Sequence, residues 1–266
     1  MKTIIQVLAA ASFAVIATAR ADDQATSQPA ASAPAASAPA ERPPVAIDMA
    51  LAKRGEPLYK RFCVSCHGPL GDGRGYSAEW LDPRPRDFTS GIFKCRSTPS
   101  GTLPTNEDLL RTIEVGVFHT YLPPWEVLGE ANLRSAIEYI KTFSPRWKEE
   151  APGIPIAIPP EPADDAASRE RGKLVWANNQ CEKCHGPQGK GNGASVPTLL
   201  DDWGFHIVPF DFTSSPNRKC GNTPMDLYRT FMTGVNGTPM PSFADSISSQ
   251  DAWDLVHYLQ TLRQQE

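Results

Sequence analysis

The sequence predicts an all-α protein built from two tandem helical domains, and three features of the chain support this. Residues 47–147 and 167–266 carry the same motifs in the same order, so one domain has been duplicated. Apolar residues recur at helical spacing near both ends of each repeat, and no alternating strand pattern of any length occurs. Proline-rich chain at 148–166 separates the repeats and reads as a stiff linker.

Each repeat is expected to contain a first helix, a middle helix and a last helix. The apolar pattern of each first helix runs directly into a cysteine-containing motif, and each of these helices contains a glycine four residues before an aromatic residue. The expected helices are residues 51–62, 106–115 and 132–143 in the first repeat, and residues 169–178, 225–233 and 250–263 in the second.

The N-terminus has the pattern of an export signal. A charged start and an apolar run over residues 4–18 precede Ala19-Arg20-Ala21, a small-residue cleavage site. The apolar run is shorter than the roughly 20 residues that span a membrane comfortably. We therefore expect residues 1–21 to be removed, leaving no membrane span and a periplasmic protein; without cleavage the segment would act as a membrane tether. Residues 24–44 consist mostly of Ala, Pro and Ser, a composition typical of a disordered tether, and we expect this tether to span residues 22–46.

The charge of the chain disfavours two classes of partner. The formal net charge is −4, and removal of Lys2 and Arg20 with the leader brings it to −6. An acidic surface argues against nucleic acid and anionic membrane and suits a protein partner with a basic docking surface. The sequence says nothing of the oligomeric state.

One motif, Cys-x-x-Cys-His, occurs in both repeats at the end of the first helix. Two thiols at this spacing can bond the vinyl groups of one haem, while the adjacent imidazole binds the iron. A zinc site would need both cysteine pairs in one cluster, yet each pair opens its own repeat. We therefore predict two covalently attached haem c groups. The thioether cysteines are Cys63 and Cys66 in the first repeat and Cys181 and Cys184 in the second, and the iron ligands are His67 and His185.

The arrangement resembles the class I cytochrome c fold over both repeats. In that family a glycine of the first helix crosses closely against an aromatic residue of the last helix. The resemblance implies that Gly55 lies near Tyr139 and that Gly172 lies near Tyr258. The chain as a whole resembles the dihaem c-type cytochromes built from two such domains.

The opposite face of each haem is expected to differ between the repeats. In the second, the loop Gly237-Thr238-Pro239-Met240-Pro241 has the form of the family's ligand loop, and Met240 is the expected sixth ligand. In the first, Leu122 aligns with Met240 and cannot bind iron. His119, three residues earlier, is the expected substitute; the alternatives are the thiolate of Cys95 or an open iron. Bis-histidine ligation would give the first haem the lower potential.

Two cysteines remain, Cys95 and Cys220, at equivalent places in the repeats. Three states are open: an inter-domain disulfide, which an exported protein permits; thiolate ligation of haem by Cys95; or two free thiols. Among the basic residues, four arginines are candidates for pairing with haem propionates, because a guanidinium matches a carboxylate. They are Arg84, Arg86, Arg96 and Arg218.

Three functions fit these features. The first is an exported electron carrier between respiratory redox proteins, with no catalytic residues of its own. The second is a dihaem oxidoreductase, similar either to thiosulfate dehydrogenases with a Cys-ligated haem or to dihaem peroxidases with an open one. The third is the electron-accepting cytochrome subunit of a separate dehydrogenase.

Overall fold

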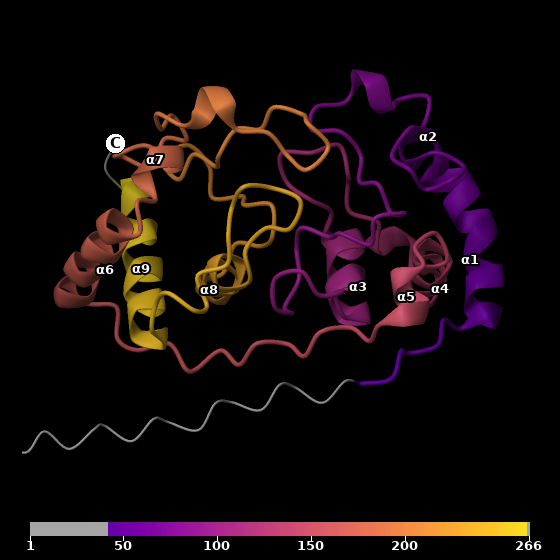
Figure 1. Cartoon of the computed structure of the whole chain (residues 1–266), viewed down its shortest axis with the longest axis horizontal. Coiled ribbons are helices and arrows are strands. Elements are labelled where there is room, and N and C mark those ends of the chain that lie inside the picture. The colour runs from indigo at the N-terminus through magenta and orange to yellow at the C-terminus, as the bar shows by residue number, and fades with distance from the viewer. Residues whose placement is uncertain (1–41, 265–266) are drawn as a thin grey trace, which may run out of the picture. The chain divides into compact units, whose positions relative to one another are not determined.

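The computed structural model describes residues 42–264 as a helical protein in which both repeats have the same order of long helices. The first repeat contains α1 (Met49–Phe62), α3 (Asn106–Val115) and α4 (Glu130–Lys141), and the second contains α6 (Ala166–Asn178), α8 (Pro224–Thr233) and α9 (Ser249–Thr261) (Figure 1). The shorter helices are α2 (Val64–His67), α5 (Arg146–Glu149) and α7 (Glu182–His185), with 3-10 turns at Ala78–Trp80, Glu126–Leu128, Val196–Thr198 and Leu262–Gln264. Between residues 42 and 264 the only β pairing is two isolated bridges.

The predicted all-α fold with tandem repeats is therefore confirmed. The predicted leader, residues 1–21, and all but the end of the predicted tether, residues 22–46, lie outside the described residues. Across the described part of the chain, no helix combines the length and apolarity needed to cross a membrane.

The first helices begin two or three residues earlier than their apolar patterns predict, because polar caps start them. The Asp48 side chain accepts hydrogen bonds from the backbone N–H groups of Ala50 and Leu51, both at 2.9 Å. At the second repeat, Asp165 accepts from Ser168 N–H at 2.8 Å. A side-chain oxygen at this position satisfies N–H groups that have no partner inside the helix. The spacing of apolar residues does not predict these first turns, because they bury few side chains.

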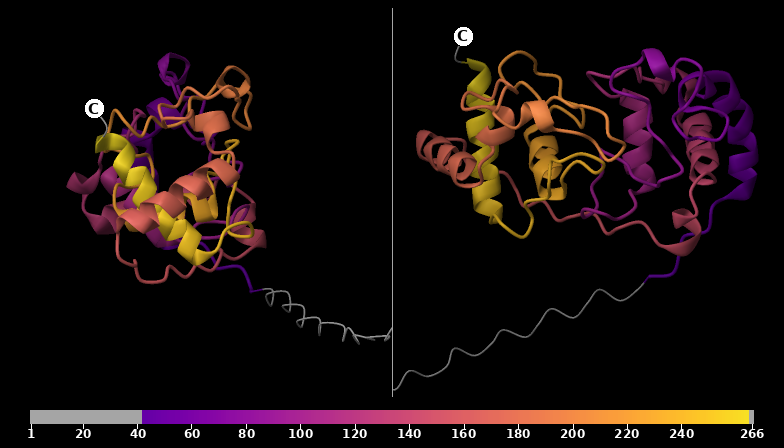
Figure 2. Two further views of the ribbon diagram at one scale, coloured as in Figure 1. Left: turned by 90° about the vertical axis from the view of Figure 1, so that its left-hand side faces the viewer. Right: turned by 45° about the horizontal axis from the view of Figure 1, so that its top comes forward.

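The first and last helices of each repeat cross in direct backbone contact, α1 on α4 and α6 on α9. Figure 2 shows the α6–α9 crossing from the side of the second repeat. A Cβ added to Gly55 would overlap the backbone carbonyl of Ser135, and one added to Gly172 would overlap that of Asp254. These carbonyls lie one helical turn before Tyr139 and Tyr258. The crossing that the family resemblance implies is present, centred one turn before the tyrosines.

The middle helices start with the same capping box. Thr105 and Asp108 exchange side-chain and backbone hydrogen bonds at α3, and Thr223 and Asp226 do the same at α8. Each of these two caps fixes where its helix begins relative to the preceding cysteine loop. The helices place apolar faces into two separate cores, one for each repeat.

The linker packs against both repeats. Ile156 N–H donates to Ser97 O at 2.8 Å in the first repeat, and Trp253 Nε1 donates to Pro159 O at 3.2 Å in the second. His257, on α9, is fully buried and its Nε2 lies 3.3 Å from Glu161 of the linker. These contacts restrain how the second repeat follows the first.

Candidate haem-binding sites

The first Cys-x-x-Cys-His motif forms one helical turn after α1. Cys63 caps α2, and His67 ends it. The His67 ring stacks on Phe88, with ring centroids 4.3 Å apart, and its Nδ1 lies 2.9 Å from the carbonyl oxygen of Arg86. A protonated Nδ1 donates to that carbonyl, which leaves Nε2 with a free lone pair. The ring is thereby fixed in the tautomer that binds a metal through Nε2.

The second motif repeats this geometry. Cys181 caps α7, His185 ends it, and the Nδ1 of His185 lies 3.2 Å from Phe210 O. The ring packs between Phe212, at a centroid distance of 5.2 Å, and Trp176, at 5.8 Å. Both sites therefore hold the histidine ring through the same atom, Nδ1, and leave the same atom, Nε2, available to bind a metal.

The residues present at both sites fit a covalent haem. The four motif cysteines are free thiols, and the Nε2 of each histidine makes no hydrogen bond to any residue of the described chain. Burial lowers the pKa of His67 to about 4 and lowers the pKa of His185 as well, so both imidazoles are neutral near pH 7. Neutral imidazole is the form that binds iron. Two thiols and one free imidazole nitrogen form the donor set of a c-type haem site.

The two expected ligand loops, residues 117–122 and 235–240, have the same backbone hydrogen bonding. Val117 N–H donates to Leu122 O at 3.1 Å, and Val235 N–H donates to Met240 O at 3.1 Å. Inside each turn a threonine hydroxyl donates to the valine carbonyl at 2.7 Å: Thr120 in the first repeat and Thr238 in the second. Leu122 and Met240 are thus structurally equivalent, as their alignment predicts.

The side chains at this equivalent position differ in chemistry. Met240 is partly buried and packs against the apolar core of the second repeat. Its thioether is a possible iron ligand, whereas the aliphatic Leu122 has no donor atom. The backbone is symmetric here, whereas only the second repeat offers a donor atom at this position.

His119 is held in a contact between the repeats. Its φ is 57°, and Gly237 occupies the equivalent left-handed position with a φ of 79°. Its Nε2 lies 2.7 Å from Asn217 O, and its ring meets the edge of Phe210 at 5.6 Å. Both partners belong to the second repeat. Ligation of the first haem by this nitrogen would require the contact with Asn217 to break.

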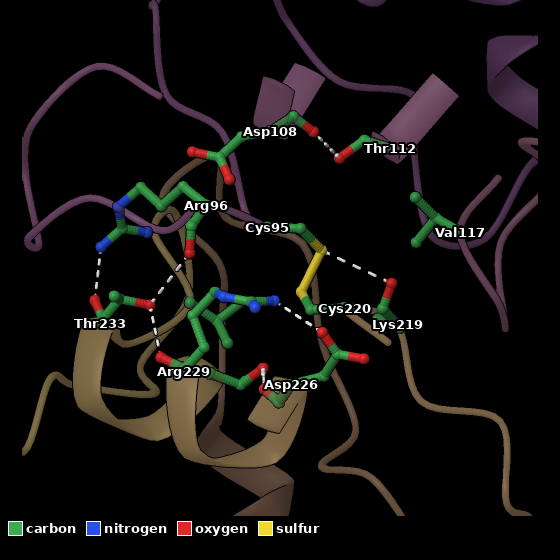
Figure 3. The surroundings of a disulfide bond; sticks show 12 residues. Cys95, Arg96, Asp108, Thr112, Val117, Lys219, Cys220, Asp226, Arg229 and Thr233 are labelled. Carbon is green, nitrogen blue, oxygen red and sulfur yellow. Dashed lines mark hydrogen bonds and ion pairs between the residues drawn. A yellow bond between two sulfur atoms is a disulfide. The ribbon is translucent and has the colours of Figure 1, made fainter. Parts of the chain in front are cut away.

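The two remaining cysteines are joined. Cys95 and Cys220 form a disulfide with their Cα atoms 5.1 Å apart, so the structure contains the first of the three states that the sequence leaves open (Figure 3). A sulfur in a disulfide is not a thiolate, and Cys95 in this state cannot bind iron. The bond connects equivalent loops of the two repeats.

Arg96, next to the disulfide, anchors the first repeat to α8 of the second. The residue is 2% exposed, and its guanidinium donates to the carbonyl oxygens of Thr233 and Gly234, at the C-terminal end of that helix (Figure 3). The end of a helix carries partial negative charge, which a buried cation stabilises. The structure therefore assigns Arg96 to the junction between repeats.

A loop of the second repeat covers two more arginines of the first. His185 and its carbonyl partner are 25 residues apart, whereas His67 and Arg86 are 19 apart. The longer segment carries Trp203 and Phe205. Arg86 lies over the Trp203 ring at 4.3 Å, and Arg84 lies over the Phe205 ring at 5.3 Å. In the sequence, the extra length of this segment in the second repeat hints at an added loop. Only the structure shows that the loop packs on Arg86 and Arg84 of the first repeat.

Comparisons with known proteins agree with this geometry. Residues 169–263 match the family described as Cytochrome c, and residues 50–140 match the family described as Cytochrome C oxidase, cbb3-type, subunit III. A chain in the solved structure of the reducing HAO-like protein complex of Kuenenia stuttgartiensis is 41% identical, with a TM-score of 0.77. The match covers 79% of the present chain and 96% of that chain.

Proposed function

Since the chain belongs to the c-type cytochromes and carries two of their domains in tandem, we propose that it is a dihaem electron-transfer protein that works with a larger redox protein. The observation that carries the proposal is the pair of Cys-x-x-Cys-His helices with both histidines fixed through Nδ1. Haem bound there supplies a one-electron ferric/ferrous couple. Cys63, Cys66, Cys181 and Cys184 would hold two haem c groups, with His67 and His185 as ligands.

The chain's own residues keep these sites rigid and apolar. The aromatic rings of Phe88, Phe212 and Trp176 pack on the ligand histidines and restrict their rotation. A site that changes little when its charge changes suits electron transfer. No residue of either site is assigned a catalytic role in this proposal.

The difference between the ligand loops supports unequal potentials. With Met240 as its sixth ligand, the second haem would have the higher potential, because a thioether favours ferrous iron. For the first haem, ligation by His119 and an open iron are the two remaining states. The contact of His119 with Asn217 supports the open state. Either state gives the first haem the lower potential.

The resemblance to a chain of the reducing HAO-like complex supports a subunit role over that of a free carrier. The formal net charge of −4 supports a partner with a basic docking surface. Export to the periplasm accords with the cytochrome c family and with the disulfide, which persists in oxidising compartments.

A single contact also supports a second candidate function. If His119 keeps its contact with Asn217, an open first haem could bind small ligands, as in the peroxidase alternative.

The test is a spectroelectrochemical titration of the intact protein and of His119→Ala. Two haems per chain and two one-electron waves are expected, with the low-spin methionine-ligated haem titrating at the higher potential. If His119 is not a ligand, His119→Ala leaves the spin state of the first haem unchanged. Conversion of that haem alone from low to high spin would establish ligation by His119, and a single haem per chain would refute the dihaem proposal.

A further inference from the structure

The two residues that hold the ligand histidines also contact the opposite repeat. Arg86 and Phe210 occupy equivalent positions, each directly before an Asp-Phe-Thr-Ser segment. The backbone carbonyl of Arg86 accepts from His67 Nδ1 at 2.9 Å, and that of Phe210 accepts from His185 Nδ1 at 3.2 Å. The side chain of each residue touches the other repeat. We call Arg86 and Phe210 the holder residues.

Arg86 reaches the ligand loop of the second repeat. Its guanidinium lies over the Trp203 ring, 4.3 Å from the centroid. A Cβ added to Gly237 would lie 2.7 Å from that ring and 3.0 Å from Nη1 of Arg86. The carbonyl oxygen of the same glycine accepts from Asp202 N–H at 3.3 Å. Trp203 and Arg86 therefore fill the space that a side chain at position 237 would need, and glycine permits their close approach.

Phe210 meets the ligand loop of the first repeat. His119 occupies in this loop the position that Gly237 occupies in the other. Its ring meets the edge of Phe210 with the centroids 5.6 Å apart, and the contact of its Nε2 with Asn217 O at 2.7 Å keeps it there. At this contact the loop supplies the side chain that reaches across, whereas at the other contact the holder residue Arg86 supplies it.

The arrangement is reciprocal. Each ligand loop touches the holder residue of the opposite repeat, and the carbonyl of each holder residue fixes a ligand histidine. A displacement of one loop therefore acts on the Nδ1–H···O bond of the other repeat's histidine, and the strength of that bond sets how basic the imidazole is as a ligand. Packed side chains of this kind carry coupling between sites, and coupling between two binding equilibria is equal in both directions.

We propose that Arg86 and Phe210 are positioning residues that couple the two haem sites, each linking the ligand histidine of one repeat to the ligand loop of the other. The proposal rests on the proposed two-haem function and adds regulation to it: loss or exchange of the sixth ligand at one site changes the potential at the other. It also gives His119 a role that needs no bond to iron, since His119 presses on the residue that holds His185.

The first experiment changes the second repeat and measures the first haem. Trp203→Leu removes the ring under Arg86 but keeps the charge of the chain and the Arg86 carbonyl. A weaker bond to His67 makes the imidazole a poorer electron donor. The ferrous-to-ferric ratio of the first haem at a fixed solution potential should therefore rise several-fold, and its electron paramagnetic resonance g-values should shift.

Two further variants of this loop separate positioning from a general loosening of the junction. Trp203→Phe keeps an aromatic face under Arg86 and should restore the wild-type ratio and g-values. Phe205→Leu is the matched control, because Phe205 lies on the same loop but over Arg84, whereas the carbonyl that holds the histidine belongs to Arg86. It should leave the first haem unchanged.

The second experiment changes the first repeat and measures the second haem. His119→Ala removes the contact with Phe210 and should raise the ferrous-to-ferric ratio of the second haem. His119→Phe keeps a ring beside Phe210 and has no nitrogen for iron, so it should leave the second haem as in the wild-type protein. Conversion of the first haem to high spin in both variants would place His119 on iron and overturn its contact with Phe210.

The haem content of the wild-type protein is measured first, so that a single haem counts against the proposed function alone. Shifts at the remote haem in Trp203→Leu and His119→Ala that the aromatic replacements abolish support the coupling. Unchanged remote haems in both experiments, or an equal shift in Phe205→Leu, would overturn it, and a response in one experiment alone would overturn its reciprocity. If Trp203→Leu does not fold, Arg86→Lys takes its place, because lysine keeps the charge and the carbonyl but lacks the planar stacking group.

Discussion

Leu122 and Met240 occupy the same position in two turns that have the same backbone hydrogen bonds. The turns that hold Leu122 and Met240 share the same backbone hydrogen bond and the same threonine contact. Because the backbone of this turn is the same, we expect the side chain at this position to account for a difference in iron ligation between the two proposed haems. A donor atom placed at 122 should therefore reach the position that Met240 would occupy relative to its own haem.

The Leu122→Met variant tests this equivalence. The new thioether should give the first haem a methionine ligand, add a second red charge-transfer band to the ferric spectrum, and raise the potential of that haem on the order of 0.1 V. Leu70→Met, an exposed substitution in the same repeat, should change neither property. An unaltered spectrum at full haem content would show that the turns are not equivalent at the iron.

At the scale of the helices, the two crossings determine how each repeat closes. Gly55 and Gly172 sit where the first helix touches the backbone of the last. Neither glycine has a positive φ, so glycine is needed here because it lacks a Cβ and not because of its wider range of backbone conformations. The packing next to the first crossing depends on this close approach. One turn beyond it, the ring centroids of Tyr59 and Tyr139 are 5.3 Å apart.

Gly55→Ala should lower the free energy of unfolding by about 1–3 kcal/mol, since the added methyl group must push α1 and α4 apart. Urea unfolding followed by far-ultraviolet circular dichroism measures the effect. Lys53→Ala, an exposed change on the same helix, should stay within about 0.5 kcal/mol of the wild-type value. Alanine has the higher helix propensity, so stabilisation by Gly55→Ala would mean that the crossing is looser than the structure shows.

At the scale of the whole described chain, a disulfide and several hydrogen bonds and cation–π contacts connect the repeats in addition to the linker. The Cys95–Cys220 disulfide closes a loop with a sequence separation of 125 residues. Arg96 adds hydrogen bonds to the end of α8, and the loop bearing Trp203 and Phe205 covers Arg86 and Arg84. The disulfide limits the separation of the repeats in the unfolded chain, whereas the other contacts act only in the folded one.

Replacement of both cysteines, Cys95→Ser/Cys220→Ser, should therefore lower the free energy of unfolding by about 2–4 kcal/mol. Guanidinium unfolding without reductant gives the value. The wild-type protein treated with reductant serves as the comparison and should behave like the variant. If the variant unfolds at the wild-type denaturant concentration, the bond contributes nothing to stability.

Much of the fold follows from local sequence. Each middle and last helix lies within two residues of its predicted bounds, because its apolar spacing is regular. The starts of α1 and α6 were less predictable, since Asp48 and Asp165 extend these helices beyond their apolar faces. The attachment motifs could be located from spacing alone, because two thiols and an adjacent imidazole must lie within one helical turn.

Contacts between the repeats could not be predicted in the same way. Cys95 and Cys220 had three possible states in the sequence, and only their proximity in the folded chain selects a disulfide. His119 lies three residues before Leu122, the position aligned with Met240, yet its ring contacts Asn217 of the other repeat.

The sequence by itself determined a duplicated all-α protein with two Cys-x-x-Cys-His motifs, because periodicity and spacing are properties of short segments. Only the tertiary structure decided the pairing of the cysteines, the environment of His119 and the contacts of Arg86 and Phe210 with the opposite repeat. Each of these depends on residues about a hundred positions apart in the chain, and their proximity is set by how the two repeats pack.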